Sequence, residues 1–391
     1  MSKTIIPANN FTDTKPHYEL LDGLRGVAAL LVVIYHIFEG LAFAEATNGA
    51  GAGLITTLNH SHIAVDFFFI LSGFVISYAY DDRWTKMSIG GFFKRRLIRL
   101  HPMLVMGALI GAVTFYIGGF EKWDGSVTPT SWVMIAMLLT MFMIPAVPGV
   151  PYEVRGNGEM FPLNGPTWSL FFEYIGNILY ALFIRRLSTK RLALLAVILG
   201  IAHGWFFIGN VSGYDNIGVG WTIDSINFWG GLVRMLFPFT VGMLLARTFK
   251  PRNVKGAFWI CSAMLLVLFA VPYIASSGKP SINSLYEFVC IAFIFPIIVW
   301  LGACGSNCKS DASTMRINKF LGDLSYPLYI VHYPIMYLFY SWLIEKQYYS
   351  LDKCIGVAAM VVALSIAVAY ACLKLYDEPL RRWLAKKFVN K

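Results

Sequence analysis

The sequence is short of charged residues. Only 14% of its 391 residues are Asp, Glu, Lys or Arg, whereas 57% are hydrophobic. A soluble globular protein carries about 25% charged residues, so a surface with so little charge cannot all face water. The shortage excludes an ordinary soluble enzyme and an intrinsically disordered chain.

Cysteine is scarce too, with six residues in the chain. This number is too small for the disulfide scaffold of a small secreted protein. Cys304 and Cys308 form a CxxxC pattern without a second cysteine or histidine pair nearby, so we expect free thiols and no metal site. The other four lie inside apolar runs, where cysteine behaves as a small hydrophobic residue: Cys261, Cys290, Cys354 and Cys372.

Several common enzyme motifs are missing. The sequence contains no GxxxxGKS/T, no GxGxxG and no HExxH pattern, so nucleotide hydrolysis and zinc-hydrolase chemistry have no support. The net charge of +10 could indicate nucleic-acid binding. The cations lie between apolar runs, however, where positive cytoplasmic loops explain them. We therefore expect a lipid bilayer, and no nucleic acid, as a partner.

Long apolar runs dominate the sequence instead. A membrane-spanning helix needs about 20 mostly apolar residues, and eleven runs come close to that length. They cover 24–43, 62–80, 102–119, 131–147, 168–184, 191–209, 228–246, 255–275, 285–303, 321–344 and 354–376.

Basic clusters between the runs indicate which segments cross. Clusters at 94–99 and 185–191 place both loops in the cytoplasm, because positive loops stay on that side. An even number of spans must separate them, but three runs lie between, so one does not cross. The best candidate is 131–147, which ends at Pro145 and leads into a Gly/Asn/Pro-rich stretch. Such backbone is tolerated at membrane depth only when it is buried in protein or lines a cavity.

The sequence thus predicts an all-α, polytopic membrane helix bundle of about ten transmembrane helices plus one re-entrant or interfacial segment. We expect a cytoplasmic N-terminal tail over 1–17, the membrane domain over 18–380 and a basic cytoplasmic tail over 381–391, with both termini cytoplasmic. The first run imitates a signal peptide, but a histidine at its centre favours an uncleaved helix.

The first run contains an arginine and a histidine ten residues apart, Arg25 and His36. Eleven steps of about 100° return them to the same helix face, about 16 Å apart along the axis. Because polar groups at membrane depth are costly, each is a functional candidate. His36 could also be a structural histidine bonded to a neighbouring helix, but the arginine on the same face favours a functional role.

Asp66 lies near the outer end of the second span, at about the depth of His36. Its carboxylate could accept a hydrogen bond from the imidazole and orient it, as in a catalytic triad. It could equally lie at the water interface without such a role. Both interpretations remain open.

Two further helices carry polar stripes. Such stripes can join helices, at about 0.6–2 kcal/mol per hydrogen bond, but several at one level favour a cavity. Glu173 is expected in the outer half of the bundle. The stripes consist of Ser169, Glu173, Asn177 and Tyr180 at i, i+4, i+8 and i+11, and of Ser325, Tyr329 and His332 at i, i+4 and i+7.

The basic segment before Pro102 contains Arg96 and Arg99. Anchoring at the cytoplasmic surface explains most cations in this segment. The two guanidinium groups would also suit a phosphate, which arginine binds in bidentate fashion.

The sequence resembles the acyltransferase 3 family, the membrane O-acyltransferases that modify cell-envelope glycans and some antibiotics in bacteria. The resemblance extends over residues 18–380 and combines motifs that are individually weak. The motifs are Arg25-x10-His36, Phe67-Phe68-x3-Ser72-Gly73-Phe74, Arg96-x2-Arg99-x2-Pro102, Trp168-Ser169-Leu170-x2-Glu173, Leu324-Ser325-Tyr326-x2-Tyr329-x2-His332-x-Pro334 and Tyr376-Asp377-Glu378-Pro379.

The resemblance implies an inner-membrane enzyme that transfers an acyl group, usually acetyl, from cytoplasmic acyl-CoA to a hydroxyl of an extracytoplasmic sugar, polysaccharide or glycolipid. The acyl-CoA is a donor substrate, and no permanently bound cofactor is expected. His36 would be the general base, or a nucleophile that forms an acyl-histidine, with Asp66 or Glu173 as its orienting residue. The phosphate-binding residues would be Arg25, Arg96 and Arg99, and the substrate cavity would include Trp168, Ser169, Tyr329 and His332.

A proton-coupled transporter is the alternative, with His36, Glu173 and His332 as an intramembrane relay. Transporters usually show two related halves with matched broken helices, and this sequence shows no such symmetry. Four aromatic residues could stack on sugar rings, although a place in the interfacial aromatic belt is favoured: Trp205, Tyr214, Trp221 and Trp229.

Overall fold

The computed structural model describes residues 18–49, 58–250, 252–274, 279–305 and 312–389. Within these ranges the chain is built from helices, and its β-structure consists of isolated bridges. The helices are α1 (Glu19–Thr47), η1 (His60–Ile63), α3 (Ala64–Tyr80), α4 (Ile89–Ile117), α5 (Thr130–Met141), α6 (Thr167–Leu182), η2 (Ile184–Arg186), α7 (Thr189–Ile208), α8 (Ser225–Thr248), α9 (Ala257–Ala270), α10 (Ile282–Val289), η3 (Cys290–Ile294), α11 (Phe295–Gly305), α12 (Ala312–Lys346), α13 (Leu351–Cys372), η4 (Leu373–Asp377) and α14 (Glu378–Phe388).

Eight helical segments in the described ranges are long and apolar enough to cross a membrane. Helix α12 is more polar than these eight and packs along α1. The shorter apolar helix α9 packs against α1 and α11. The bundle thus consists of the eight apolar segments with α9 and α12 packed among them. The predicted all-α polytopic membrane bundle is confirmed.

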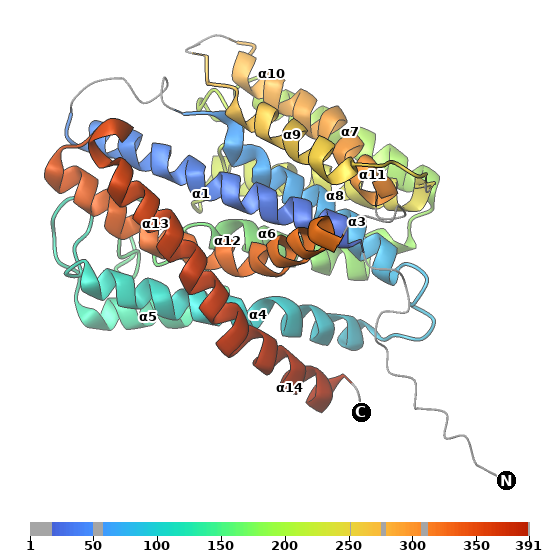
Figure 1. Ribbon diagram of the computed structural model, residues 1–391, viewed down its shortest axis with the longest axis horizontal. Coiled ribbons are helices and arrows are strands. Elements are labelled where there is room, and N and C mark those ends of the chain that lie inside the picture. The colour runs from blue at the N-terminus through green and yellow to red at the C-terminus, as the bar shows by residue number, and fades with distance from the viewer. Residues whose placement is uncertain (1–17, 50–57, 251, 275–278, 306–311, 390–391) are drawn as a thin grey trace.

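Helix α5 corresponds to the run that we expect not to cross. Its 12 residues reach about 18 Å, well short of the hydrocarbon thickness of about 30 Å. It packs against α4 (Figure 1) and is followed by a loop over 142–166. This arrangement agrees with the expectation for the run 131–147.

The bundle has two distinguishable ends. Helices α1 and α4 begin, and α14 ends, at the same end of the molecule (Figure 1), which we call the basic end. The opposite end holds the loop over 142–166 and the end of α1. Of the two predicted tails, residues 1–17 lie outside the described ranges, whereas most of 381–391 forms helix α14, which packs against α4.

Close packing of α1 on α12 brings their polar stripes together. A methyl group on Gly26 would lie 2.3 Å from the carbonyl oxygen of Leu321, and one on Gly23 would lie 2.8 Å from the side chain of Asn318. Small residues let membrane helices approach at backbone distance. The two helices therefore face each other along most of their length.

The described cysteines are free thiols, and all except Cys372 are buried. Cys304 is buried at the end of α11. Its CxxxC partner Cys308 lies outside the described residues.

Candidate functional site

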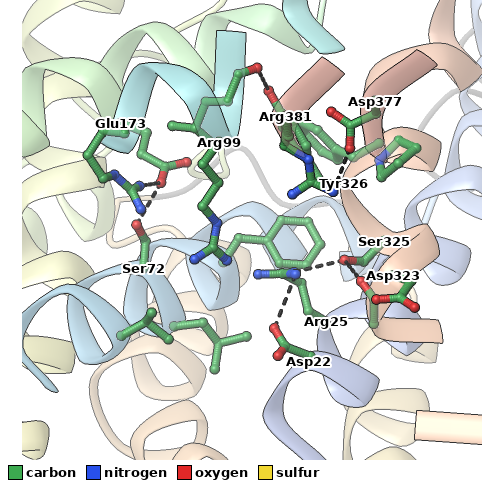
Figure 2. Close-up of a pocket in the computed structure, with 18 of the residues that line it drawn as sticks. Asp22, Arg25, Ser72, Arg99, Glu173, Asp323, Ser325, Tyr326, Asp377 and Arg381 are labelled. Carbon is green, nitrogen blue, oxygen red and sulfur yellow. Dashed lines mark hydrogen bonds and ion pairs between the residues drawn. The ribbon is translucent and has the colours of Figure 1, made fainter. Parts of the chain in front are cut away.

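A cavity of about 690 Å³ opens at the basic end, between α1, α3, α4, α6, α12 and α14 (Figure 2). Arg25 and Arg99 line its outer part, which we call the mouth, whereas Ser169 and Tyr329 line its inner end. The Ser169 and Tyr329 hydroxyl oxygens are 2.7 Å apart. The cavity thus leads from a cationic mouth to a pair of hydroxyls inside the bundle.

The predicted arginines all line this cavity. Arg25 donates to the Ser325 hydroxyl at 2.8 Å and forms an ion pair with Asp22 at 3.1 Å. Arg99 points into the space opposite Arg25 (Figure 2). In the described part of the chain, the Arg99 guanidinium has no side-chain or carbonyl partner, so it is available to a ligand.

The third arginine, Arg96, is already paired. Its Nη2 lies 2.8 Å from Glu173 Oε1, and the Ser72 hydroxyl donates to the same oxygen at 2.7 Å. The Arg96 side chain is 6% exposed, so it needs a partner that compensates its desolvation. Glu173 therefore lies against a buried arginine of the cavity, and not beside His36 in the outer half of the bundle.

His36 and His332 form a direct pair beyond the inner end of the cavity. His36 Nδ1 lies 3.0 Å from His332 Nε2, and His332 Nδ1 lies 2.9 Å from the carbonyl oxygen of Leu328. A carbonyl can only accept, so the Nδ1 of His332 carries a proton. In the neutral pair, His36 Nδ1 then donates to His332 Nε2. This leaves a free lone pair on His36 Nε2, as a general base requires.

Glu39 lies on the other side of His36. Its Oε2 is 3.7 Å from His36 Nε2, and it accepts hydrogen bonds from Tyr340 at 2.9 Å and Tyr333 at 3.3 Å. The Glu39 side chain is 32% exposed, whereas that of His36 is 12% exposed. The sequence analysis missed Glu39, although it follows His36 by three residues and so shares its helix face.

Asp66 has a different partner from the predicted one. Arg234 donates to both Asp66 carboxylate oxygens, at 2.9 to 3.2 Å, and both side chains are buried. This pair joins α3 to α8. A buried carboxylate gains most from a guanidinium that binds it in bidentate fashion. An arginine within the apolar run 228–246 was the signal that could have revealed Arg234.

Only two of the four residues predicted to line the substrate cavity do so. Ser169 and Tyr329 line the cavity. His332 lies one turn beyond Tyr329, with ring centres 6.0 Å apart, and pairs with His36. Trp168 packs instead over the guanidinium of Arg234, 5.0 Å from the ring centre.

A second buried polar cluster lies at the opposite end and was not predicted. The fully buried Glu287 carboxylate contacts His60 Nδ1 at 2.8 Å and His62 Nε2 at 3.1 Å. It also accepts from the backbone N–H of Ile217 at 2.8 Å and from the Tyr273 hydroxyl at 3.3 Å. The cluster ties η1 and two loops to α10, which indicates a structural role.

The four aromatic residues considered for sugar binding lie in two different settings. Trp205 and Trp229 are 69% and 59% exposed on α7 and α8, as expected for residues facing lipid headgroups. Tyr214 and Trp221 line a shallow hollow of about 540 Å³ beside the loop over 142–166. Only the second pair faces a hollow of the protein surface.

These features define a polytopic membrane protein with a cation-lined cavity that ends about one helix turn from a histidine pair. The acyltransferase 3 family model, described as an acyltransferase domain, matches residues 18–374. The chain belongs to this family, as the resemblance in its sequence indicated, and it is a membrane O-acyltransferase.

Similar proteins agree with this membership. The chain is 33% identical to protein 2 in the picA locus of Rhizobium radiobacter, over 48% of this chain and 95% of that protein. It is 27% identical to the acyltransferase MdmB of Streptomyces mycarofaciens, over 81% of this chain and 78% of that one. It is 24% identical to the peptidoglycan O-acetyltransferase OatA of Listeria monocytogenes, over 93% of this chain but 55% of OatA. No solved structure matches the chain.

The transporter alternative loses support. Glu173 pairs with Arg96, whereas His36 pairs with His332, so the three residues of the supposed relay do not form one hydrogen-bonded chain. Family membership also favours the enzyme.

Proposed function

We propose that the enzyme transfers an acyl group, usually acetyl, from acyl-CoA to a hydroxyl of a sugar, polysaccharide or glycolipid, with His36 as general base. The observation that carries this proposal is the hydrogen bond between His36 Nδ1 and His332 Nε2 at 3.0 Å. It leaves His36 Nε2 unprotonated and directed toward the side on which Glu39 lies.

The reaction needs few groups. His36 Nε2 takes the proton of the acceptor hydroxyl as its oxygen attacks the thioester carbonyl carbon. The C–O bond forms, the C–S bond breaks, and the thiolate of CoA takes up the proton that His36 releases. A thiolate is a good leaving group, so deprotonation of the acceptor is the step that the protein assists. A covalent acyl-His36 intermediate is the variant with His36 as nucleophile.

The donor enters through the cavity at the basic end. Arg25 and Arg99 line the mouth, where they would bind its phosphates through charge-assisted hydrogen bonds. The separation of about 16 Å between Arg25 and His36 along α1 is of the order of the length of a pantetheine arm. The basic end is then cytoplasmic in the inner membrane, with both termini on that side, in agreement with the positive-inside rule.

The acceptor approaches from the opposite end. Glu39 is partly exposed beside His36 Nε2, so a sugar hydroxyl between the two could donate to either group. The acetylation of peptidoglycan by a relative such as OatA supports an extracytoplasmic glycan as acceptor. The two substrates would thus meet at His36 from opposite sides of the membrane.

The proposal is tested by CoA release from labelled acetyl-CoA by the purified protein in detergent, with and without a crude envelope glycan extract. We expect glycan-stimulated release from the wild type and its loss in His36→Ala, by about 10²–10⁴-fold. His101→Ala, a histidine of α4 outside the pair, is the matched control and should remain active.

Two results would contradict the proposal in different ways. Full activity of a folded His36→Ala variant would remove His36 from the mechanism. If folded wild-type protein shows neither CoA release nor acetyl-CoA binding, acyl-CoA is not the donor. A rapid-quench experiment without acceptor distinguishes direct transfer from an acyl-His36 intermediate by the presence of protein-bound label.

A further inference from the structure

We propose that the C-terminal helix α14 completes the donor site, with Arg381 and Arg382 binding the 3′-phosphate of acyl-CoA. This inference rests on the acyl-CoA donor proposed above. It assigns a ligand to a segment that the sequence indicated only as a basic tail.

Helix α14 forms one wall of the cavity. Arg381, Arg382 and Ala385 line it together with residues of α1, α4 and α12. The helix packs against α4, which carries Arg96 and Arg99. Figure 2 shows Arg381 directed toward the same space as Arg99. The last helix of the chain therefore brings cations to a site otherwise built from the first and middle helices.

Unsatisfied polar atoms collect in this cavity. In the described ranges, four buried side-chain atoms without a hydrogen-bond partner belong to its lining residues. Two of these atoms are guanidinium N–H donors, which an anion can satisfy, and two are oxygen acceptors, which it cannot. The four atoms are Arg96 Nε, Asn318 Oδ1, Asp377 Oδ1 and Arg381 Nε.

Asp377 holds Arg381 in place. Its Oδ2 lies 2.7 Å from Arg381 Nη2, and its side chain is 1% exposed. The ion pair engages the Nε/Nη2 edge of the guanidinium, and Nη1 on the other edge has no partner among the described residues. A phosphate oxygen is an acceptor of the right charge for the N–H groups of Nη1.

The exposure of the arginines gives their order from the interior to the mouth. The side chains are 6% exposed for Arg96 and 26% for Arg25, then 36% for Arg381 and 80% for Arg382. In acyl-CoA the order from the reactive end is thioester, pantetheine, diphosphate and 3′-phosphoadenosine. With the thioester near His36, the diphosphate reaches the level of Arg25, and the 3′-phosphate lies further out beside α14.

The test compares CoA with 3′-dephospho-CoA as competitors of labelled acetyl-CoA on the purified full-length protein, so no acceptor is needed. The wild type should bind CoA at least about tenfold more tightly than 3′-dephospho-CoA. Arg381→Gln should weaken CoA binding by about that factor and leave dephospho-CoA binding nearly unchanged. Lys386→Gln removes a charge from an exposed part of the same helix outside the cavity and should preserve the discrimination.

Arg382→Gln provides a second variant whose folding is not in question, because this side chain is 80% exposed. Equal affinity for CoA and dephospho-CoA in a wild type that binds acetyl-CoA would overturn the role of α14 and leave the donor proposal intact. The role of α14 would also be overturned if both arginine variants still bound CoA more tightly than dephospho-CoA. If the folded wild type does not bind acetyl-CoA, the proposal that acyl-CoA is the donor is itself overturned.

Discussion

His36 Nδ1 lies 3.0 Å from His332 Nε2, although 296 positions separate these residues in the chain. The pair forms because α1 and α12 pack at backbone distance, with each helix presenting one polar stripe to the other. The acceptor for the proton of His332 is a carbonyl of its own helix. The orientation of the proposed base therefore depends on a second histidine, and not on a carboxylate as in a catalytic triad.

Replacement of His332 should reduce turnover without weakening donor binding. In His332→Leu, His36 Nδ1 loses its acceptor and the ring loses its preferred tautomer. We expect kcat to fall by about tenfold or more, the value of one buried hydrogen bond, with the KM for acetyl-CoA unchanged. His332→Gln should recover part of the activity, because its amide oxygen can accept the same proton. A Leu variant with wild-type kcat would show that His332 only fills space.

Replacement of Arg99 should act on the donor alone. We expect Arg99→Ala to raise the KM for acetyl-CoA by about tenfold to a hundredfold, the value of a charged hydrogen bond, and to leave the KM for the acceptor unchanged. Lys94→Ala removes an exposed charge of the same segment outside the cavity and serves as the control. An unchanged KM for acetyl-CoA in Arg99→Ala would show that Arg99 only anchors this segment at the membrane surface.

The loop over 142–166 should make stability depend on pH through Glu159. Burial raises the pKa of this carboxyl from 4.5 to about 7, although Tyr337 and Asn157 donate to it. Because the folded-state pKa is higher, this contribution to stability is complete below pH 4.5 and is lost as the pH rises through about 7. The loss amounts to about 3 kcal/mol at most.

Glu159→Gln should remove that dependence. Its thermal unfolding midpoint in detergent should change less between pH 5 and pH 8 than that of the wild type, and it should be the more stable of the two at pH 8. Glu121→Gln, an exposed residue of the same end of the bundle, should follow the wild type. Parallel curves for Glu159→Gln and wild type would contradict the buried protonated state.

Substitution of Gly26 should loosen the contact that brings the histidines together. In Gly26→Ala the new methyl group would lie 2.3 Å from the carbonyl oxygen of Leu321, and such overpacking costs about 1–3 kcal/mol. We expect a lower unfolding temperature in detergent together with lower activity. Gly356→Ala on α13 has no atom within 4 Å and should be neutral or stabilising. Equal stability of the two variants would show that the helices can separate without loss.

The sequence by itself determined the membrane class and the positions of the apolar helices, including the short one before the loop over 142–166. These properties depend on hydropathy, run length and the position of Pro145 and of the basic clusters, all of which are local. It also indicated which helix faces are polar, because positions i, i+4 and i+7 share a face whatever lies opposite. His36, Ser169 and Tyr329 were found in this way.

Only the tertiary structure decided which polar groups meet. Asp66 pairs with Arg234, Glu173 with Arg96, and His36 with His332, and a single sequence contains no signal for such pairings. Each depends on the depth and rotation of one helix against another, which close packing at positions such as Gly26 sets. The placement of α14 over the cavity has the same origin, because its basic face has a role only through the helices that it contacts.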